Sequence, residues 1–295
     1  MLVDIICGFL GAGKTTLINK LITLYKQRGE KIVIIENEYG SVNIDKYLFK
    51  NENIAVYEMT SGCLCCTLKG NLELCLQEIR DHVKPDRVII EPSGIFVIDE
   101  ILTVFNTLDF QMFKLNQVIT VVDSVHFLRY CHKYNAILGA QMKRADVIIV
   151  SKVTKETDSV LLQNNIRRFN MNAPIIEKPW DELTLQEMEM LIGKRQTLIK
   201  KPRRKIKKVS ALPSQKNGVI QHEFITETIE AKENYTKEAF DDLLQQLRSK
   251  DILRCKGFIS IEHKSYIFQY VDGEYSLEEA ARTIEENTLV AIKNM

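Results

Sequence analysis

The chain has 295 residues and a net charge of +1, a balance that excludes a strongly basic nucleic-acid binder and favours no membrane partner. Its 45% apolar and 27% charged residues indicate a globular protein, with one large domain and, as we expect, one small one. No apolar run approaches the ~18 residues that span a bilayer, and the first is too short for a signal peptide. We therefore expect a cytoplasmic protein whose seven cysteines are reduced.

A glycine-rich motif follows the first apolar run. Residues 8–15 read Gly-Phe-Leu-Gly-Ala-Gly-Lys-Thr and fit G-x-x-x-x-G-K-[ST], between an apolar run at 2–7 and an amphipathic run at 15–28. In a strand, loop and helix of this order, backbone N–H groups and the helix dipole face a phosphate. We predict nucleotide binding, with Lys14 on the β- and γ-phosphates and Thr15 on Mg²⁺. The other predicted nucleotide contacts in this motif are Gly11, Ala12, Gly13 and Thr16.

The next strands deliver polar residues to the same edge of the expected sheet. A buried strand at residues 31–35 leads into Glu-Asn-Glu-Tyr-Gly at 36–40, at the edge where open α/β sheets bind ligands. The irregular segment 41–53 is typical of a loop that orders with nucleotide. A short strand follows at 55–59.

Three thiols then lie close together in the sequence. Cys63, Cys65 and Cys66 follow Gly62, which permits a tight turn, so the sulfurs can converge on one ion such as Zn²⁺ or Cu⁺. The segment supplies only three ligands, which suits a metal that must leave better than a closed structural site. Two other interpretations stay open: small residues that pack a loop, and a redox triad.

A second acidic site is predicted after the fourth strand. A helix is expected at residues 70–82 and a buried strand at 86–90, which ends at Glu91. Its carboxylate stands at a strand end, where an acidic residue that contacts Mg²⁺ is expected. Gly94, three residues later, lies where the backbone can approach the γ-phosphate.

These motifs resemble those of one family. Gly-Phe-Leu-Gly-Ala-Gly-Lys-Thr-Thr, Glu-Asn-Glu-Tyr-Gly, Gly-Cys-Leu-Cys-Cys and Glu-Pro-Ser-Gly, in this order, are similar to the CobW-like metal-chaperone GTPases, relatives of UreG and HypB. The resemblance covers nearly the whole chain. It implies a P-loop domain with a mainly parallel sheet flanked by helices, a small α+β C-terminal domain, and GTP, Mg²⁺ and Zn²⁺ or a related ion as ligands.

The resemblance also assigns residue roles. It implies that Lys14 and Glu91 are the catalytic residues, that Thr15 and Glu91 hold Mg²⁺, and that Gly94 senses the γ-phosphate. Glu36 becomes a candidate ligand of the transported metal, beside the three cysteines. Many relatives carry another acid where this chain has Ser41, so the fourth metal ligand stays open.

The guanine side shows one departure from the family pattern. A strand at 146–150 leads to Ser151 and Lys152, both predicted nucleotide contacts, and then to Thr154, where relatives have the Asp that binds guanine. A neutral oxygen there lowers guanine preference by about ten- to a hundredfold. Asp158 can replace it only if the loop is rebuilt.

Two further residues near this loop have alternative roles. A strand at 116–122 ends at Asp123, which caps the next helix or faces the nucleotide pocket, and we favour the cap. After the run 173–177, Trp180 packs near the purine or is simply buried.

We expect a GTPase domain at 1–193, a basic linker at 194–215 and a C-terminal domain at 216–295. The linker lacks the aromatic residues that stack on bases, so we expect no nucleic-acid binding. The C-terminal domain should contain a strand at 219–229 and a helix at 237–249. A hairpin of 254–261 with 266–271, a final helix and a closing strand at 289–292 follow. Cys7, Cys75, Cys131 and Cys255 are expected in the core.

The sequence therefore predicts a GTP-driven switch that captures a transition-metal ion and passes it to an unknown client metalloprotein. Segment 36–45 is the expected coupling element, and a GTP-dependent homodimer is possible. Three alternatives remain: a P-loop ATPase or kinase, a non-enzymatic metal sensor, and cobalt delivery to a corrinoid.

Overall fold

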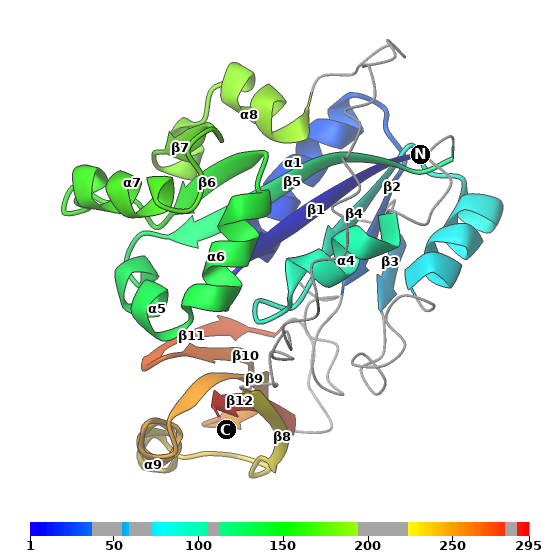
Figure 1. Cartoon of the computed structure of the whole chain (residues 1–295). Helices are drawn as coiled ribbons and strands as arrows, with labels where there is room; N and C mark the ends of the chain where they lie inside the picture. The colour runs from blue at the N-terminus through cyan, green and yellow to red at the C-terminus, as the bar shows by residue number, and fades with distance from the viewer. Residues whose placement is uncertain (37–54, 59–71, 106–111, 194–223, 281–287, 295) are drawn as a thin grey trace, which may run out of the picture.

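The computed structural model describes residues 1–36, 55–58, 72–105, 112–193, 224–280 and 288–294. Within them, seven parallel strands form one sheet in the order β3-β2-β4-β1-β5-β6-β7 (Figure 1). The strands are β1 Leu2–Gly8, β2 Ile32–Glu36, β3 Ala55–Glu58, β4 Arg87–Glu91, β5 Lys114–Asp123, β6 Val147–Ser151 and β7 Ile175–Glu177. Parallel strands buried on both faces read as continuous apolar runs, which is why the sequence predicted most of them.

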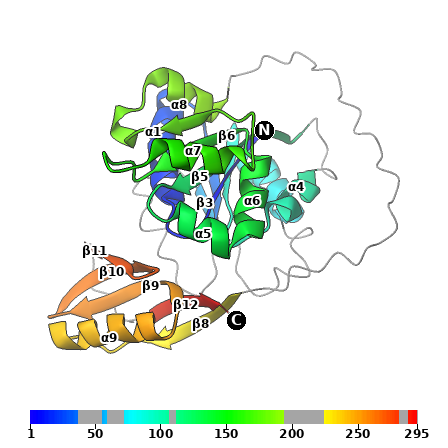
Figure 2. The same cartoon turned by 60° about the vertical axis from the view of Figure 1, so that its left-hand side comes forward.

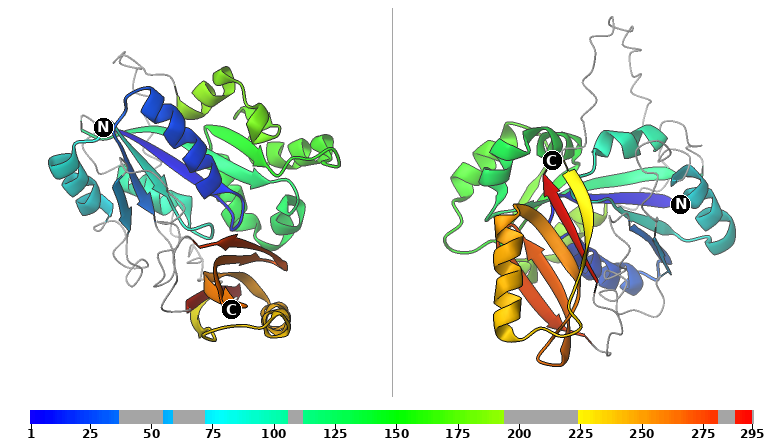
Figure 3. Two further views of the ribbon diagram at one scale, coloured as in Figure 1. Left: turned by 180° about the vertical axis from the view of Figure 1, so that it is seen from behind. Right: turned by 90° about the horizontal axis from the view of Figure 1, so that it is seen from below.

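Helices cover both faces of this sheet. Helices α1 and α8 pack on one face, where Leu17, Ile18, Leu21, Ile22 and Tyr25 of α1 are all buried as the helical spacing predicted (Figure 3). The helix over 72–78, α4, α5, α6 and α7 pack on the opposite face, whereas Trp180 of η2 packs on the same side as α1 and α8. The bounds are α1 Lys14–Gln27, a helix over 72–78 that runs into η1 Ile79–Val83, α4 Ile98–Phe105, α5 Phe127–Lys133, α6 Asn135–Arg144, α7 Ser159–Arg167, η2 Trp180–Glu182 and α8 Leu185–Ile192.

A buried charge cluster lies near the start of the first and fourth strands. Arg87 is 1% exposed and forms ion pairs with Asp4 and, at 2.7 Å, with Glu30. Asn116 donates to Asp4 Oδ1 at 2.6 Å, and the Tyr25 ring lies 4.4 Å from the guanidinium carbon of Arg87. Because each charge has a partner, the cluster joins β1, β4 and α1 at the end of the sheet away from the glycine loop.

A second, antiparallel sheet forms the C-terminal domain. Its order is β11-β10-β9-β12-β8, and α9 (Lys237–Ser249) covers one of its faces (Figure 2). Helix α9 has the predicted bounds and begins at Thr236, whose hydroxyl accepts from the Ala239 N–H at 3.2 Å. The strands are β8 Phe224–Glu230, β9 Ile252–Ile261, β10 Lys264–Val271, β11 Glu274–Glu279 and β12 Thr288–Asn294.

The predicted hairpin continues into a further strand, Glu274–Glu279, that the sequence did not predict. These residues form β11, paired in antiparallel register with β10. Asp272 and Gly273 between the strands have φ of 49° and 98°, the two positive values of a type I′ turn. This turn joins the two strands directly. Residues 281–287 lie outside the described part.

Several predicted segments also fall outside the described residues: the loop at 41–53, the cysteine loop with Cys63, Cys65 and Cys66, and the basic linker at 194–215. In the described part of the chain, no helix combines the length and the apolar character needed to cross a membrane.

Candidate functional site

The glycine motif forms a loop between β1 and α1. Gly11 and Gly13 have φ of 70° and 93°, a left-handed conformation that residues with a Cβ rarely adopt. Helix α1 starts at Lys14 with no side-chain cap and no acidic residue in its first turn, so its N-terminal N–H groups remain for an anion. Lys14 is 6% exposed, and its Nζ donates to the Phe9 carbonyl at 3.3 Å. The loop has the geometry that the motif predicts for a phosphate cradle.

A cavity of about 670 Å³ opens above this loop, a size typical of small-molecule sites. The C-terminal domain forms part of its wall. The cavity is lined by seven of the residues predicted to contact nucleotide or Mg²⁺, whereas Ala12, Gly94 and Ser151 are buried and do not line it. The lining residues are Gly11, Gly13, Lys14, Thr15, Thr16, Asn19, Thr23, Glu91, Lys152, Arg254, Gln269, Ser276 and Glu278.

Thr15 and Glu91 meet at the phosphate end of the cavity. The Thr15 hydroxyl lies 3.1 Å and 3.2 Å from the two carboxylate oxygens of Glu91 and donates to them. Hydroxyl and carboxylate oxygens are the ligands that Mg²⁺ prefers, so these two side chains fit the ion. When bound, Mg²⁺ neutralises phosphate charge.

Glu36 lies beside Glu91 in the sheet. The two residues are register partners on neighbouring strands β2 and β4, and Glu36 is also the register partner of Glu58 on β3. Neighbouring strands are ~4.8 Å apart. Glu36 is 7% exposed, so two acidic residues are adjacent at a poorly solvated edge, where a nearby cation lowers their repulsion.

Gly94 supports the loop from below. A Cβ built on Gly94 would lie 2.5 Å from the backbone nitrogen of Leu10, so only glycine fits there. The sequence predicted a close backbone approach at Gly94, and the contact that the structure shows is with the phosphate loop itself.

Family comparisons agree with this geometry. Residues 2–177 match the family described as CobW/HypB/UreG, nucleotide-binding domain. The chain belongs to the CobW/HypB/UreG family. Residues 224–295 match the cobalamin synthesis protein cobW C-terminal domain. Both the resemblance drawn from the motifs and the fold class are confirmed.

Curated relatives of this CobW-family chain include zinc chaperones. The zinc chaperone YjiA of Escherichia coli (strain K12) is 32% identical over 180 residues, which cover 59% of this chain and 56% of YjiA. The zinc-regulated GTPase metalloprotein activator 1 of Schizosaccharomyces pombe is 31% identical over 200 residues, or 61% of this chain and 46% of that protein. The chain thus spans about half the length of the curated relatives it matches.

Among solved structures, the Zn(II)-bound YjiA GTPase from E. coli is similar, with 24% identity and a TM-score of 0.49. The similarity covers 100% of this chain and 94% of that one. HypB from Helicobacter pylori in complex with nickel is 17% identical, with a TM-score of 0.44 over 64% of this chain and 81% of that one.

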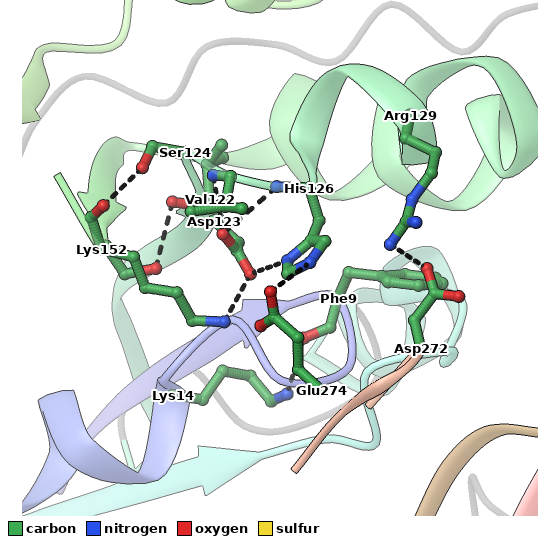
Figure 4. A network of polar contacts seen from close by, with 12 residues as sticks. Phe9, Lys14, Val122, Asp123, Ser124, His126, Arg129, Lys152, Asp272 and Glu274 are labelled. Atoms are coloured by element: carbon green, nitrogen blue, oxygen red, sulfur yellow. Dashed lines mark hydrogen bonds and ion pairs between the residues drawn. The ribbon is translucent and has the colours of Figure 1, made fainter. Parts of the chain in front are cut away.

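A polar network joins the nucleotide pocket to α5 (Figure 4). Lys152, which has a φ of 55°, lies with its Nζ 2.8 Å from Asp123 Oδ2. Asp123 Oδ1 accepts from the N–H of Val125 at 2.9 Å. Burial raises the pKa of Asp123, but hydrogen bonds from Lys152 and His126 outweigh it, so the pKa lies below its ordinary value.

The favoured prediction that Asp123 caps the next helix is wrong, because that helix begins only after His126, three residues further along the chain. The N-cap of α5 is His126, which makes no side-chain cap bond. Asp123 instead binds the backbone of the turn before α5 and, through Lys152, the wall of the nucleotide cavity.

The loop after Lys152 is not rebuilt around Asp158. Asp158 is the N-cap of α7 and accepts from the Leu161 N–H at 2.9 Å. The Thr154 hydroxyl accepts from the Glu156 N–H at 3.3 Å. Thr154 thus keeps the position at which the family pattern has a guanine-binding Asp.

Thr154→Asp is expected to raise the preference for GTP over ATP by about ten- to a hundredfold, because a carboxylate accepts stronger hydrogen bonds from guanine than a hydroxyl does. Dissociation constants for both nucleotides measure the ratio. Val160→Asp, which adds the same charge at a position 72% exposed, should leave it unchanged. An unaltered ratio in Thr154→Asp would show that position 154 does not read the base.

Trp180 reports on the same pocket. It is the only tryptophan of the chain, and its ring lies 3.2 Å from a Cβ built on Gly13. Its Nε1 donates to the Val150 carbonyl at 2.8 Å, so the ring is fixed against the phosphate loop. Adding nucleotide is expected to change tryptophan fluorescence in a saturable way. Trp180→Phe should abolish the change while binding, measured by calorimetry, persists; a wild-type signal that does not saturate would place Trp180 away from the ligand.

The cysteines of the described part are core residues, as predicted. Burial raises the pKa of Cys7 and of Cys131 to about 11 and that of Cys255 to about 12, and it also raises the pKa of the half-buried Cys75. They are protonated at neutral pH, and metals bind thiolates. No group of three His, Cys, Asp or Glu residues suited to a metal occurs among the described residues.

Proposed function

We propose that this protein is a GTP-hydrolysing chaperone that captures and transfers zinc. The observation that carries the proposal is the register pairing of Glu36, at the start of the expected metal segment, with Glu91, whose carboxylate contacts Thr15 at the phosphate cradle. Family membership and relatives named zinc chaperones support it.

The proposed roles follow the motifs. Lys14 binds the β- and γ-phosphates, and Thr15 and Glu91 hold Mg²⁺. Gly94 keeps the backbone of its loop against the phosphate loop. The zinc cargo is held by Cys63, Cys65, Cys66 and Glu36, a donor set of three thiolates and one carboxylate that suits tetrahedral Zn²⁺.

Coupling between the two sites requires energy of a definite size. Zinc sites of this type reach apparent binding free energies of ~10–16 kcal/mol, so release is slow unless the nucleotide weakens the site. About 5.5 kcal/mol of differential affinity changes a two-state population from 1:99 to 99:1. Departure of the γ-phosphate would remove negative charge beside Glu91, and Glu36, one strand away at a poorly solvated edge, would feel that change.

The test is the zinc affinity of the full chain in three states: without nucleotide, with GDP, and with a non-hydrolysable GTP analogue. Competition with a chromophoric chelator measures it. The proposal expects zinc affinity to differ at least tenfold between the GTP-analogue and GDP states, and metal to be lost in Cys65→Ser. Equal affinities in the two states would reject the chaperone, because a coupled site must respond in both directions.

An ATPase is the second candidate, and the neutral Thr154 favours it. Turnover of GTP against ATP under the same conditions separates the two. We further propose that residues 194–215 link the two domains and that the chain acts in the cytoplasm, where thiols stay reduced. In this proposal the chain delivers metal to a client metalloprotein and forms a homodimer when GTP is bound.

A further inference from the structure

The C-terminal domain supplies part of the nucleotide cavity. Its four lining residues, Arg254, Gln269, Ser276 and Glu278, lie on neighbouring strands β9, β10 and β11. Gln269 and Ser276 are register partners, so their side chains leave the same face of the sheet. Helix α9 covers the opposite face. The sheet therefore presents a polar face to the phosphate loop.

The turn between β10 and β11 fixes this face against the loop. Cγ1 of Val271, the last residue of β10, would lie 2.9 Å from a Cβ built on Gly11, so the Val271 side chain packs directly on the Gly11 backbone. Asp272 forms an ion pair with Arg129 of α5, and Glu274 Oε1 lies 3.5 Å from His126 Nε2 (Figure 4). Three successive contacts thus anchor the turn beside the phosphate cradle.

Arg254 is one strand away from that contact. It is the register partner of Val271 in the β9–β10 pair, so the two side chains leave the same face of the sheet. On its other side the β9–β12 pair shifts register next to Ile292, opposite Ile252 and Arg254. Such bulges re-aim side chains and are common beside active sites. Leu253, the extra residue, is buried in a core shared with Phe9 of the phosphate loop.

We propose that Arg254 is a phosphate-binding residue of the nucleotide site, contributed by the C-terminal domain of the same chain. This inference rests on the proposed function, which it deepens. Arg254 is the cation among the described residues that this domain places on the cavity, and it enters from the Gly11 side, whereas Trp180 packs at Gly13. A guanidinium is permanently charged and binds two phosphate oxygens at once.

Through this contact the C-terminal domain responds directly to the phosphates of the bound nucleotide. A γ-phosphate binds Arg254 and so attracts β9 toward Lys14, and its loss after hydrolysis removes that attraction. The anchored turn transmits the change because Val271, Asp272 and Glu274 form one continuous segment.

The test compares nucleotides of different phosphate number on three variants of the full chain, by calorimetry in Mg²⁺. Arg254→Gln should lower the affinity for a non-hydrolysable GTP analogue by about ten- to a hundredfold, as expected for loss of a charged hydrogen bond. It should lower the affinity for GMP by less than about twofold. Arg254→Lys should retain part of the affinity. The control Lys250→Gln removes a charge from an exposed position of the same domain that does not line the cavity, and should behave as wild type.

Unchanged analogue affinity in Arg254→Gln, or equal losses for the analogue and GMP, would overturn the inference. If Arg254→Gln unfolds, Arg254→Lys decides the question. A severalfold loss of affinity confined to the GTP analogue supports the contact, and an analogue affinity equal to that of wild type overturns it. Failure of the wild type to bind any guanine nucleotide would instead reject the proposed function itself.

Discussion

Arg87→Leu is expected to lower the free energy of unfolding of the nucleotide-binding domain by about 3–5 kcal/mol, the usual cost of removing one partner from a buried ion pair. The substitution leaves Asp4, with 0% exposure, and Glu30, with 8%, without their common cation. Urea unfolding followed by circular dichroism measures the loss. Asp4 keeps hydrogen bonds from Asn116 and Tyr25, so the fold itself should survive.

The same variant should also acquire a pH dependence. Burial raises the pKa of Asp4 above its ordinary value even though Arg87 lowers it, so loss of Arg87 raises it further. A carboxyl with a folded-state pKa above its unfolded value binds more protons in the native state. Stability is then present at low pH and is lost as pH rises through the folded pKa. The deficit of Arg87→Leu should therefore grow as pH rises above the ordinary carboxyl range and through the raised folded-state pKa of Asp4.

Two controls separate charge from packing. Arg144→Leu removes an ion pair with Asp99 in which both side chains are about half exposed, and it should change stability by less than about 1 kcal/mol. The double variant Asp4→Asn, Arg87→Leu should cost less than the sum of its two single variants, because it no longer buries the lone aspartate charge. Additive losses would show that the cluster stabilises through side-chain packing alone.

Local patterns explain why much of the fold was predictable. The strands of the parallel sheet are short apolar runs, and the glycine loop needs its positive φ angles only where glycines stand in the motif. Strand β11 was not predicted, because Leu277, Glu278, Glu279 and Ala280 favour helices individually. The Asp272-Gly273 turn and pairing with β10 override that propensity, and this Asp-Gly pair is the local signal that could have indicated the strand.

The part of the cavity wall that the nucleotide-binding domain forms was predictable, and the part that the C-terminal domain forms was not. Lys14, Thr15, Glu91 and Lys152 belong to motifs with fixed spacing along one domain. Arg254 reaches the same cavity only through tertiary contacts such as that of Gly11 with Val271, which are 260 residues apart in sequence and leave no local pattern. The ion cluster around Arg87 was missed for the same reason.

Lys14→Ala is expected to reduce GTP hydrolysis by about a hundred- to a thousandfold, the usual cost of removing one group that stabilises transition-state charge. Lys14 is buried in the glycine loop, at the start of α1, and lines the cavity in which we propose that the phosphates bind. Phosphate release at saturating nucleotide measures the loss. Lys20→Ala removes the same charge from the same helix, where Lys20 only pairs with the exposed Asp181, and should remain within about twofold of wild type.

Zinc binding by Lys14→Ala distinguishes a working switch from a metal sensor with an idle nucleotide site. The residue is not among the proposed metal ligands, so zinc affinity without nucleotide should equal that of wild type. Since the coupling energy acts through the bound phosphates, the difference between the GTP-analogue and GDP states should disappear together with hydrolysis. A variant that hydrolyses no GTP yet keeps the wild-type difference in zinc affinity would place the coupling in nucleotide binding alone and remove Lys14 from it.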